Sequence, residues 1–274
     1  MNSIFITDLD HTFLRSDLSI SPFSEHIWNA KVAKNILTVA TARSFKKSEQ
    51  FLANLQINAP MILLDGALIV SQKRQIIQSL CIDKALGDAV IDMGAALQSF
   101  PFVLARQGTA LDEVFLYPAQ RNAYQDKLLQ RYRGDDHLQE ETDIRARAAN
   151  FKLVYMGEEA MLQELQKHLY GTFGDALKYI LAPEAYMGCF FLTLLHPHAD
   201  KAHGLQCVSE YLERDLSEMT VFGDNLNDLG MFAKAGTSVA VSNAHETLKA
   251  RADIVLNHSN DEDGVARYLE AQGV

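Results

Sequence analysis

Short apolar segments alternate with helical ones at both ends of the chain but not in its middle, and this pattern constrains the fold most strongly. The candidate strands of this alternating pattern are residues 4–6, 36–40, 61–64, 219–222, 238–241 and 254–256. Strands that alternate with helices predict a parallel sheet covered by helices on both faces. The two ends of the chain are therefore expected to form one doubly wound α/β domain.

The middle of the chain follows a different pattern. Between about residues 84 and 195, candidate strands occur in pairs between helices, and a polar stretch at 134–147 reads as a connection. A chain of 274 residues is long enough for two domains. We therefore expect a core built from residues 1–83 and 196–274, interrupted by an α+β domain at 84–195.

Net charge, cysteine spacing and the distribution of apolar residues exclude several classes of partner and indicate the cellular location. The formal net charge of −10 and the isoelectric point near 5.3 argue against nucleic acid or an anionic membrane as a partner. Cys81, Cys189 and Cys207 lie far apart, which argues against a disulfide framework and a cysteine-based zinc site. No secretion signal or membrane-spanning stretch is recognisable, so the expected location is the cytoplasm.

The first candidate strand runs directly into Asp8-Leu9-Asp10-His11-Thr12. In an extended segment, this spacing points both carboxylates to the same side, where they repel unless a cation or a proton is present. Asp8 could then act as a nucleophile or metal ligand, with Asp10 as acid/base and Thr12 orienting it. A strand followed by a plain polar turn explains this stretch equally well by itself.

Polar groups also follow other strands, and in a doubly wound sheet the carboxyl ends of the strands share the edge where ligands bind. The side chains expected to converge there are Asp8, Asp10, Thr41, Lys201, Asp224, Asn227 and Asp228. Clustered carboxylates suit Mg²⁺, while Lys201 and the hydroxyl and amides that begin at Thr41 suit phosphate oxygens. Asp10 could protonate a leaving oxygen and then deprotonate the water that attacks an aspartyl-phosphate. The predicted chemistry is phosphoryl transfer.

The motifs resemble a known family. The four that resemble the motifs of the haloacid dehalogenase superfamily, in the same order, are Asp8-Leu9-Asp10-His11-Thr12, Thr41-Ala42-Arg43, Lys201 and Gly223-Asp224-Asn225-Leu226-Asn227-Asp228. Those similar to its Cof-type branch are Asp65-Gly66-Ala67, Ser242-Asn243-Ala244 and 260–264, which ends in Asp263-Gly264. That branch carries an α+β cap between the second and third motifs, where the alternation of this chain breaks.

The resemblance implies a Rossmann-like core and an Mg²⁺-dependent phosphatase with Asp8 as nucleophile and Asp10 as acid/base. The metal ligands that it implies are Asp8, the main-chain carbonyl of Asp10, and Asp224. The phosphate-binding groups that it implies are the Leu9 amide, Thr41, Ala42, Lys201 and Asn227. The residues expected to support them are Thr12, Arg43 and Asp228, although Arg43 reads equally well as a surface residue.

Two positions depart from the family pattern. His11 stands where the family usually has glycine, and His is among the few other residues enriched at positive φ. Asp65 stands where the branch usually has asparagine, and an ionised carboxylate cannot donate a hydrogen bond. A substrate role for Asp65 is therefore in doubt.

Plainer interpretations apply elsewhere. His196, His198 and His203 lie near Lys201, but their spacing fits no established zinc motif and the carboxylates favour Mg²⁺. The aromatic residues of the inserted domain, which we read as its core, are Phe100, Phe102, Phe115 and Tyr117.

The expected function is hydrolysis of a small phosphorylated metabolite, such as a sugar phosphate, through an aspartyl-phosphate. Phosphoryl transfer between sugar positions, as in related mutases, and a phosphate-sensing module without turnover are the alternatives. The sequence leaves the oligomeric state open and is compatible with a monomer.

Overall fold

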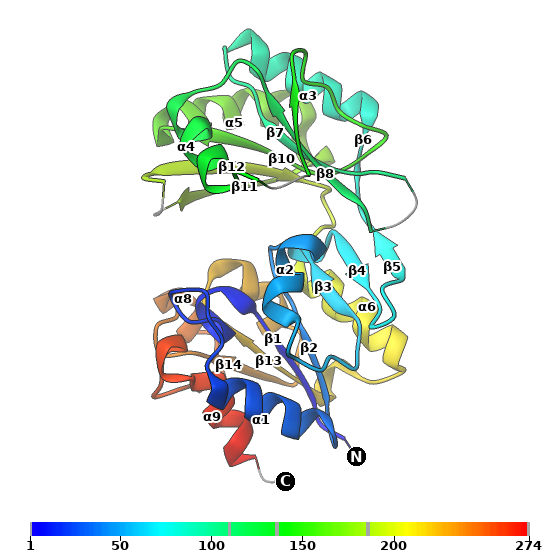
Figure 1. The fold of residues 1–274 in the computed structure, drawn as a ribbon, viewed down its shortest axis with the longest axis vertical. Coiled ribbons are helices and arrows are strands. Elements are labelled where there is room, and N and C mark those ends of the chain that lie inside the picture. Colours follow the sequence, from blue (N-terminus) through cyan, green and yellow to red (C-terminus); the bar gives the residue numbers. More distant parts are fainter. Residues whose placement is uncertain (1, 109–110, 135–136, 185–186, 273–274) are drawn as a thin grey trace. The chain divides into compact units, whose positions relative to one another are not determined.

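The computed structural model describes residues 2–108, 111–134, 137–184 and 187–272, and the chain divides into two compact units. The discontinuous unit consists of Met1–Ser79 and Ala199–Val274, and the inserted unit of Leu80–His198. Figure 1 shows the elements of each unit, coloured along the chain.

A five-stranded parallel sheet forms the centre of the discontinuous unit. Its strands, in spatial order, are β15 (Ile254–Val255), β14 (Thr237–Ala240), β13 (Met219–Gly223), β1 (Ile4–Thr7) and β2 (Ile36–Val39). All four residues of β1 are buried, as expected of a central strand that is covered on both faces. The predicted α/β class is confirmed.

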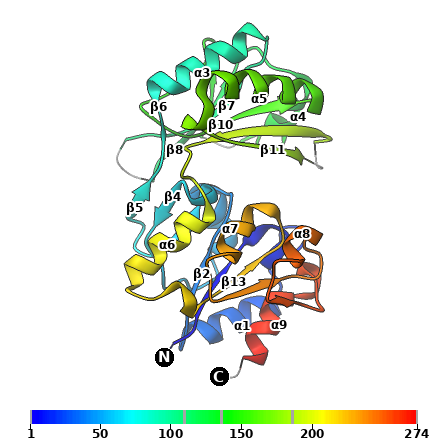
Figure 2. The same ribbon diagram turned by 180° about the vertical axis from the view of Figure 1, so that it is seen from behind.

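Helices pack on both faces of this sheet. On one face, α1 (Pro22–Val32) packs against α9 (Gly264–Ala271), as Figure 1 shows. On the other, α6 (Lys201–Leu212) packs against α7 (Leu229–Phe232), as Figure 2 shows from behind. Two further helices are α2 (Phe45–Leu52) and α8 (Glu246–Lys249). Ser21 is the N-cap of α1, and its side chain accepts a hydrogen bond from the Ser24 amide. The next residue, Pro22, is the first of the helix.

A small antiparallel sheet lies beside β2. Its strands are β3 (Met61–Leu63), β4 (Leu68–Val70) and β5 (Ile76–Ser79). β3 lies parallel to the end of β2 through a single bridge between Ala40 and Ile62. The short helical turns of this unit are η1 (Leu9–Phe13), η2 (Leu64–Gly66), η4 (Leu216–Glu218), η5 (Leu226–Asp228) and η6 (Asn260–Glu262).

The inserted unit is an α+β domain with a largely antiparallel sheet. Its strands, in spatial order, are β11 (Lys178–Glu184), β12 (Cys189–Leu195), β10 (Ala149–Gly157), β7 (Phe102–Arg106), β8 (Glu113–Pro118) and β9 (Leu138–Glu141), and β6 (Ile82–Asp83) also pairs with β10. Its helices are α3 (Lys84–Ala96), α4 (Ala123–Arg131), α5 (Glu159–Phe173) and the turn η3 (Gly174–Ala176). Side chains of β10 alternate between two clusters, with Tyr155 in the cluster of α3 and α5 and Met156 in the cluster of α4.

Three predictions for this unit need correction. The polar stretch at 134–147 contains β9, which pairs in parallel with β8; residues 135–136 lie outside the described residues. β9 is a half-exposed edge strand, so its polar sequence carries no apolar alternation that would reveal it. The sequence pattern predicts helices over residues 84–100 and 158–169, whereas α3 ends at Ala96 and α5 continues to Phe173.

The aromatic side chains predicted to form the core of this unit do pack into its two hydrophobic clusters; they are Phe100, Phe102, Phe115 and Tyr117. No helix in the described part of the chain is both long and apolar enough to cross a membrane.

Candidate active site

The candidate site lies where the order of the parallel strands reverses. The chain passes from β1 to its neighbour β2 on one side, whereas β13, β14 and β15 extend the sheet on the other side of β1. The loops that follow β1 and β13 therefore meet at the switch point of the sheet, where ligands of such folds bind. The Asp8 amide donates to the Phe222 carbonyl at 3.0 Å and joins the two loops.

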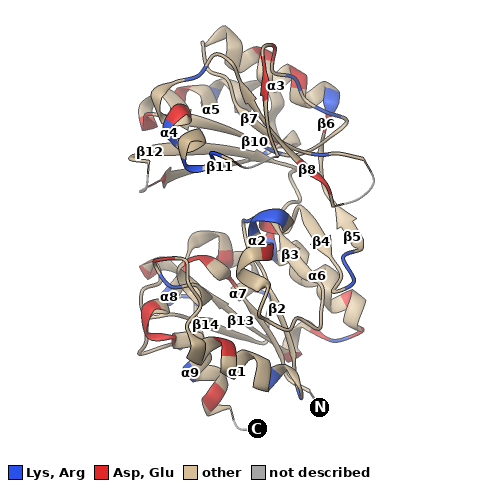
Figure 3. Ribbon diagram, viewed as in Figure 1, with Lys and Arg blue, Asp and Glu red and all other residues tan. Residues whose placement is uncertain are grey.

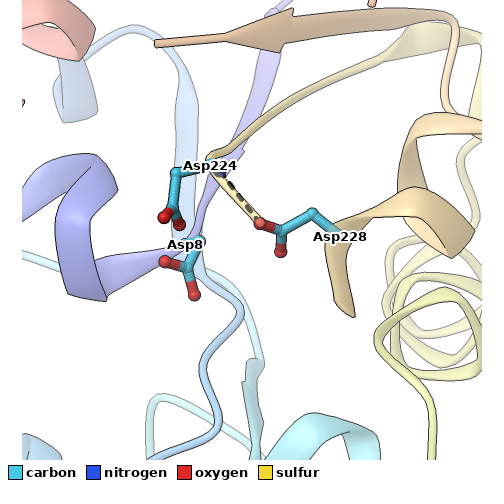
Figure 4. Close-up of side chains that lie close together, drawn as sticks. All are labelled: Asp8, Asp224 and Asp228. Carbon is cyan, nitrogen blue, oxygen red and sulfur yellow. Dashed lines mark hydrogen bonds between the residues drawn. The ribbon is translucent and has the colours of Figure 1, made fainter. Parts of the chain in front are cut away.

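Three carboxylates from these two loops lie together. Asp8 follows β1, while Asp224 and Asp228 belong to the loop after β13, as Figure 4 shows. One oxygen from each carboxylate lies within 4.8 Å of the others. Lys201, at the start of α6, places its Nζ atom 2.5 Å from Asp8 Oδ1 and 2.7 Å from Asp228 Oδ1. Four of the predicted site residues are thus in one cluster.

Asp228 organises this cluster. Its Oδ1 atom accepts from Lys201, and its Oδ2 atom accepts from the amides of Asp224 and Asn225 at 3.0 and 3.1 Å. A Cβ atom at Gly223 would lie 2.5 Å from Asp228 Oδ2, so only glycine permits this close approach. Because one oxygen of Asp228 binds Lys201 and the other binds amides of its own loop, Asp8 and Asp224 remain the carboxylates best placed for an external ligand.

Burial dominates the electrostatics of the cluster. It raises the pKa of Asp8 well above its usual value, and the ammonium of Lys201 opposes this only in part. Burial, followed by the charge of Asp228, raises the pKa of Asp224 to about 6. Burial would lower the pKa of Lys201, but Asp228 and Asp8 raise it overall, so the lysine remains protonated. Three carboxylates thus share one ammonium, an arrangement that favours a further cation.

The turn η1 joins Asp8 to the rest of the site. Thr12 is buried, and its hydroxyl donates to Asp224 Oδ1 at 3.0 Å. His11 has a φ of 56° and a ψ of 9°, in the left-handed region, where glycine would be the usual residue. This chain therefore retains the backbone turn despite the substitution.

Arg43 braces Asp10. Its Nε and Nη2 atoms lie 2.7 and 2.5 Å from the two oxygens of Asp10, and its guanidinium lies 4.5 Å from the ring centroid of Phe51. The Arg43 amide donates to the Thr41 hydroxyl at 3.1 Å. This contact favours the interpretation of Arg43 as a residue that braces a carboxylate, and its supporting role in the site stays a prediction. Figure 3 shows basic residues on the neighbouring α2 and acidic residues on the loops beside α8.

The turn η2 connects the remaining polar residues. The Asp65 amide donates to the Thr41 carbonyl at 3.1 Å, and Asp65 Oδ1 accepts from Asn227 Nδ2 at 2.9 Å. A Cβ atom at Gly66, whose φ is 86°, would lie 2.1 Å from the carbonyl oxygen of Asp200. Asp200 is the N-cap of α6, so this close approach positions the start of the helix that carries Lys201.

Other predicted residues keep their roles only as predictions. Leu9 is buried and Ala42 half-buried, and their amides remain proposed phosphate donors. The rings of His196 and His198 lie 5.5 Å apart, whereas His203 contacts Gln78. In the described residues, the group of at least three potential metal ligands is the carboxylate cluster.

Two contacts were missed from the sequence. Asp65 accepts from Asn227, and Asn243 donates from Nδ2 to the His11 carbonyl at 2.8 Å. Both residues belong to motifs that we noted, but a motif alone does not name the partner of a side chain.

Comparisons with known proteins agree with this geometry. Residues 5–269 match a family described as haloacid dehalogenase-like hydrolase. The HMP-PP phosphatase of Serratia proteamaculans is 24% identical over 268 residues, which cover 96% of this chain and 92% of the relative. The 5-amino-6-(5-phospho-D-ribitylamino)uracil phosphatase of Bacillus subtilis is 23% identical over 271 residues, which cover 96% of this chain and 94% of the relative.

A crystal structure shares the fold. A haloacid dehalogenase-like hydrolase from Bacteroides thetaiotaomicron superposes with a TM-score of 0.84 at 21% identity, covering 100% of each chain. The family match over nearly the whole chain and the full-length phosphatase relatives lead to one conclusion. The chain belongs to the haloacid dehalogenase-like hydrolases and is an enzyme of the phosphatase type.

Proposed function

We propose that this phosphatase depends on Mg²⁺ and hydrolyses a small phosphorylated metabolite through an aspartyl-phosphate on Asp8. The observation that carries the proposal is the cluster at the switch point, where three carboxylates lie within 4.8 Å and Lys201 bridges two of them. A binding module would need neither a buried nucleophile nor an acid/base beside it.

The donor set fits a divalent metal. The cluster offers only hard oxygen ligands, and burial raises the pKa of both Asp8 and Asp224, so a cation would relieve their repulsion. We assign the metal to Asp8, Asp224 and the main-chain carbonyl of Asp10, with Asp228 holding the loop. Bound there, Mg²⁺ would neutralise the charge of the phosphoryl group.

The phosphoryl group would be held by Lys201 and by the segment after β2. Thr41 accepts from the Arg43 amide, so its own hydroxyl proton can still be donated to a phosphate oxygen. Asn227 binds Asp65 through one amide hydrogen and has a second to offer. The amides of Leu9 and Ala42 complete this proposed set.

The chain supplies the two steps of hydrolysis. A carboxylate oxygen of Asp8 attacks phosphorus, the bond to the leaving oxygen breaks, and Asp10 donates its proton to that oxygen. Asp10 then takes a proton from water, which attacks the same phosphorus and breaks its bond to Asp8. Arg43 binds both carboxylate oxygens of Asp10, so this contact must loosen before Asp10 can reach the leaving oxygen.

The substrate class rests on two arguments. The site residues of the discontinuous unit would contact the phosphoryl group, which is common to all phosphate esters, so selectivity must come from elsewhere. We assign it to the inserted unit, acting as a cap that favours small esters such as sugar phosphates over phosphopeptides. The two phosphatase relatives named above act, by their names, on small phosphorylated molecules.

The first test is the Asp8→Asn variant, which keeps the shape of the side chain but removes the attacking charge. With 4-nitrophenyl phosphate and Mg²⁺, we expect turnover to fall roughly 10³-fold or more, as when other nucleophiles are removed. The matched control is Asp215→Asn at the N-cap of η4, the turn that precedes the opposite end of β13. Beryllium fluoride, a mimic of the phosphorylated carboxylate, should stabilise the wild type against heat but not Asp8→Asn.

Near-normal turnover by Asp8→Asn would overturn the nucleophile assignment, and full activity in excess EDTA would overturn the metal. A screen of sugar phosphates, polyol phosphates and phosphopeptides tests the substrate class. Phosphopeptides as the best substrates would contradict it.

A further inference from the structure

The segment that follows β14 contacts both catalytic loops of the discontinuous unit. Asn243 Nδ2 donates to the main-chain carbonyl of His11 at 2.8 Å, in the turn that carries Asp10. The amide of His245 donates to the main-chain carbonyl of Asp224 at 2.7 Å. Both acceptors are main-chain carbonyls of the loops that carry the proposed catalytic residues. The segment can therefore fix the positions of these loops without itself contacting a substrate.

Asn243 bridges two backbone groups. While its Nδ2 atom binds the His11 carbonyl, its Oδ1 atom accepts from the Asn260 amide at 2.9 Å. Asn260 is buried, and its own Nδ2 atom donates to the Leu14 carbonyl at 3.0 Å. The Leu14 amide donates to the Leu9 carbonyl at 2.7 Å and closes the turn. The turn is thus held at two carbonyls by two linked asparagines.

The turn has a particular need for this support. His11 adopts the left-handed conformation, which is unfavourable for a residue with a Cβ atom and persists only when its surroundings impose it. The carbonyl that Asn243 holds belongs to this same residue, one position after Asp10. Rotation of the peptide between His11 and Thr12 would change ψ of His11 and disturb the turn that carries Asp10.

We propose that Asn243 is a positioning residue for Asp10. By fixing the His11 carbonyl, its amide keeps Asp10 in the orientation that delivers a proton to the leaving oxygen. This inference rests on the proposed function, in which Asp10 is the acid/base.

The Asn243→Asp variant tests the donor alone. The carboxylate is nearly isosteric and can still accept from the Asn260 amide, but it presents an acceptor oxygen to the His11 carbonyl. The turn must then shift away. Small misplacements of a catalytic group lower rates by up to about 10²-fold, so we expect kcat for phenyl phosphate to fall about 10- to 100-fold.

The leaving group separates positioning from simple loss of structure. Phenolate is a far more basic leaving group than 4-nitrophenolate, so cleavage of phenyl phosphate depends more strongly on an acid, although the two esters are similar in shape. Asn243→Asp should therefore lower kcat for phenyl phosphate several times more than for 4-nitrophenyl phosphate. A smaller active fraction would lower both equally.

Asn58 provides a matched control in the same unit. It is also exposed and also bridges backbone groups, since Asn58 Nδ2 donates to the Asn35 carbonyl and Oδ1 accepts from the Leu37 amide, both at 2.8 Å. Asn58→Asp removes the same kind of donor without touching η1. We expect similar thermal midpoints for the two variants, with kcat for both esters unchanged in Asn58→Asp.

The Asp10→Asn variant separates this inference from the proposed function. If Asp10→Asn shows no preference between the two esters, Asp10 is not the acid and the proposed function fails. If Asp10→Asn loses phenyl phosphate selectively but Asn243→Asp does not, the role of Asn243 alone is overturned. When Asn243→Asp is combined with Asp10→Asn, the double variant should show the same difference between the two esters as Asp10→Asn alone. A larger selective loss for phenyl phosphate in the double variant would also overturn the role of Asn243.

Discussion

The two units bury polar groups for different purposes. In the discontinuous unit, Asp8, Asp228 and Lys201 are ionisable, almost fully buried and in mutual contact. In the inserted unit, the most deeply buried polar side chains are neutral: Asn150 donates to the carbonyls of Ile82 and Arg147. Buried charges are costly even when paired, whereas a buried amide that satisfies backbone carbonyls supports the fold. The buried charges of the discontinuous unit therefore indicate a reactive site, whereas the buried amide of Asn150 indicates support of the fold.

The largest difference in stability loss between the two units should follow from removing the buried ammonium of Lys201. Lys201→Met leaves Asp8 and Asp228 buried without their ammonium, which should destabilise the protein by about 3–5 kcal/mol in EDTA. Phosphatase turnover should fall by roughly two orders of magnitude or more, as when an electrostatic stabiliser of the transition state is removed. Urea unfolding and steady-state kinetics measure the two effects.

The control is Lys127→Met in the inserted unit, where the lysine donates to a main-chain carbonyl at 3.2 Å. We expect a loss of less than about 1 kcal/mol there. Equal losses for Lys201→Met and Lys127→Met would contradict the distinction between the two units.

Metal addition should stabilise one unit selectively. At 100 times its dissociation constant, a ligand that binds only the folded state stabilises it by about 2.7 kcal/mol. Hydrogen exchange of amides in β13 and η5 should therefore slow with Mg²⁺, while exchange in β10 and α5 changes little. Asp224→Asn should abolish the effect. Equal slowing in both units, or slowing that survives Asp224→Asn, would place the metal elsewhere.

In the inserted unit, Asn150→Asp should affect stability and not chemistry. The carboxylate cannot donate to the carbonyls of Ile82 and Arg147, so we expect a loss of about 1–3 kcal/mol. The kcat of the remaining folded protein for 4-nitrophenyl phosphate should stay within about twofold of wild type. A much larger fall in kcat, measured where the variant is fully folded, would show that the buried amide does more than support the fold.

The smallest expected effect concerns one aspartate in each unit. Burial raises the pKa of Asp263, but hydrogen bonds from Arg15 and Ser24 outweigh it, and the pKa is lowered overall. Burial also raises the pKa of Asp88, which its contact with Lys84 lowers overall. The side chain of Asp263 is 10% exposed and that of Asp88 is 25% exposed, so the first should contribute more to stability.

We expect Asp263→Asn to cost about 1 kcal/mol at pH 7 and Asp88→Asn less than about 0.5 kcal/mol. Because the folded-state pKa is depressed in both cases, these contributions are present above the unfolded-state pKa of about 3.9 and vanish as the pH falls through the folded-state pKa. Urea unfolding at several pH values measures them. A cost for Asp263→Asn that persists well below pH 3 would show that ionisation is not its origin.

Much of the fold was predictable because its signals are local. The buried strands of the discontinuous unit are continuous apolar runs, and helix starts such as Ser21-Pro22 carry their own caps. β9 was missed because a polar edge strand is defined by its pairing with β8 and not by its own residues. The ends of α3 and α5 were misplaced because helix boundaries depend on packing as well as on propensity.

The sequence by itself determined the α/β class, the insertion and the chemical types of the site residues. Strand ends, motif order and carboxylate spacing can each be recognised within short segments of the chain. Only the tertiary structure decided which of those groups meet. Lys201 bridges Asp8 and Asp228, Arg43 binds Asp10, and Asn243 holds the turn at His11. These partners lie between 27 and 232 residues apart along the chain. Contacts over such separations depend on how the strands are ordered and how closely the loops approach, which no local periodicity specifies.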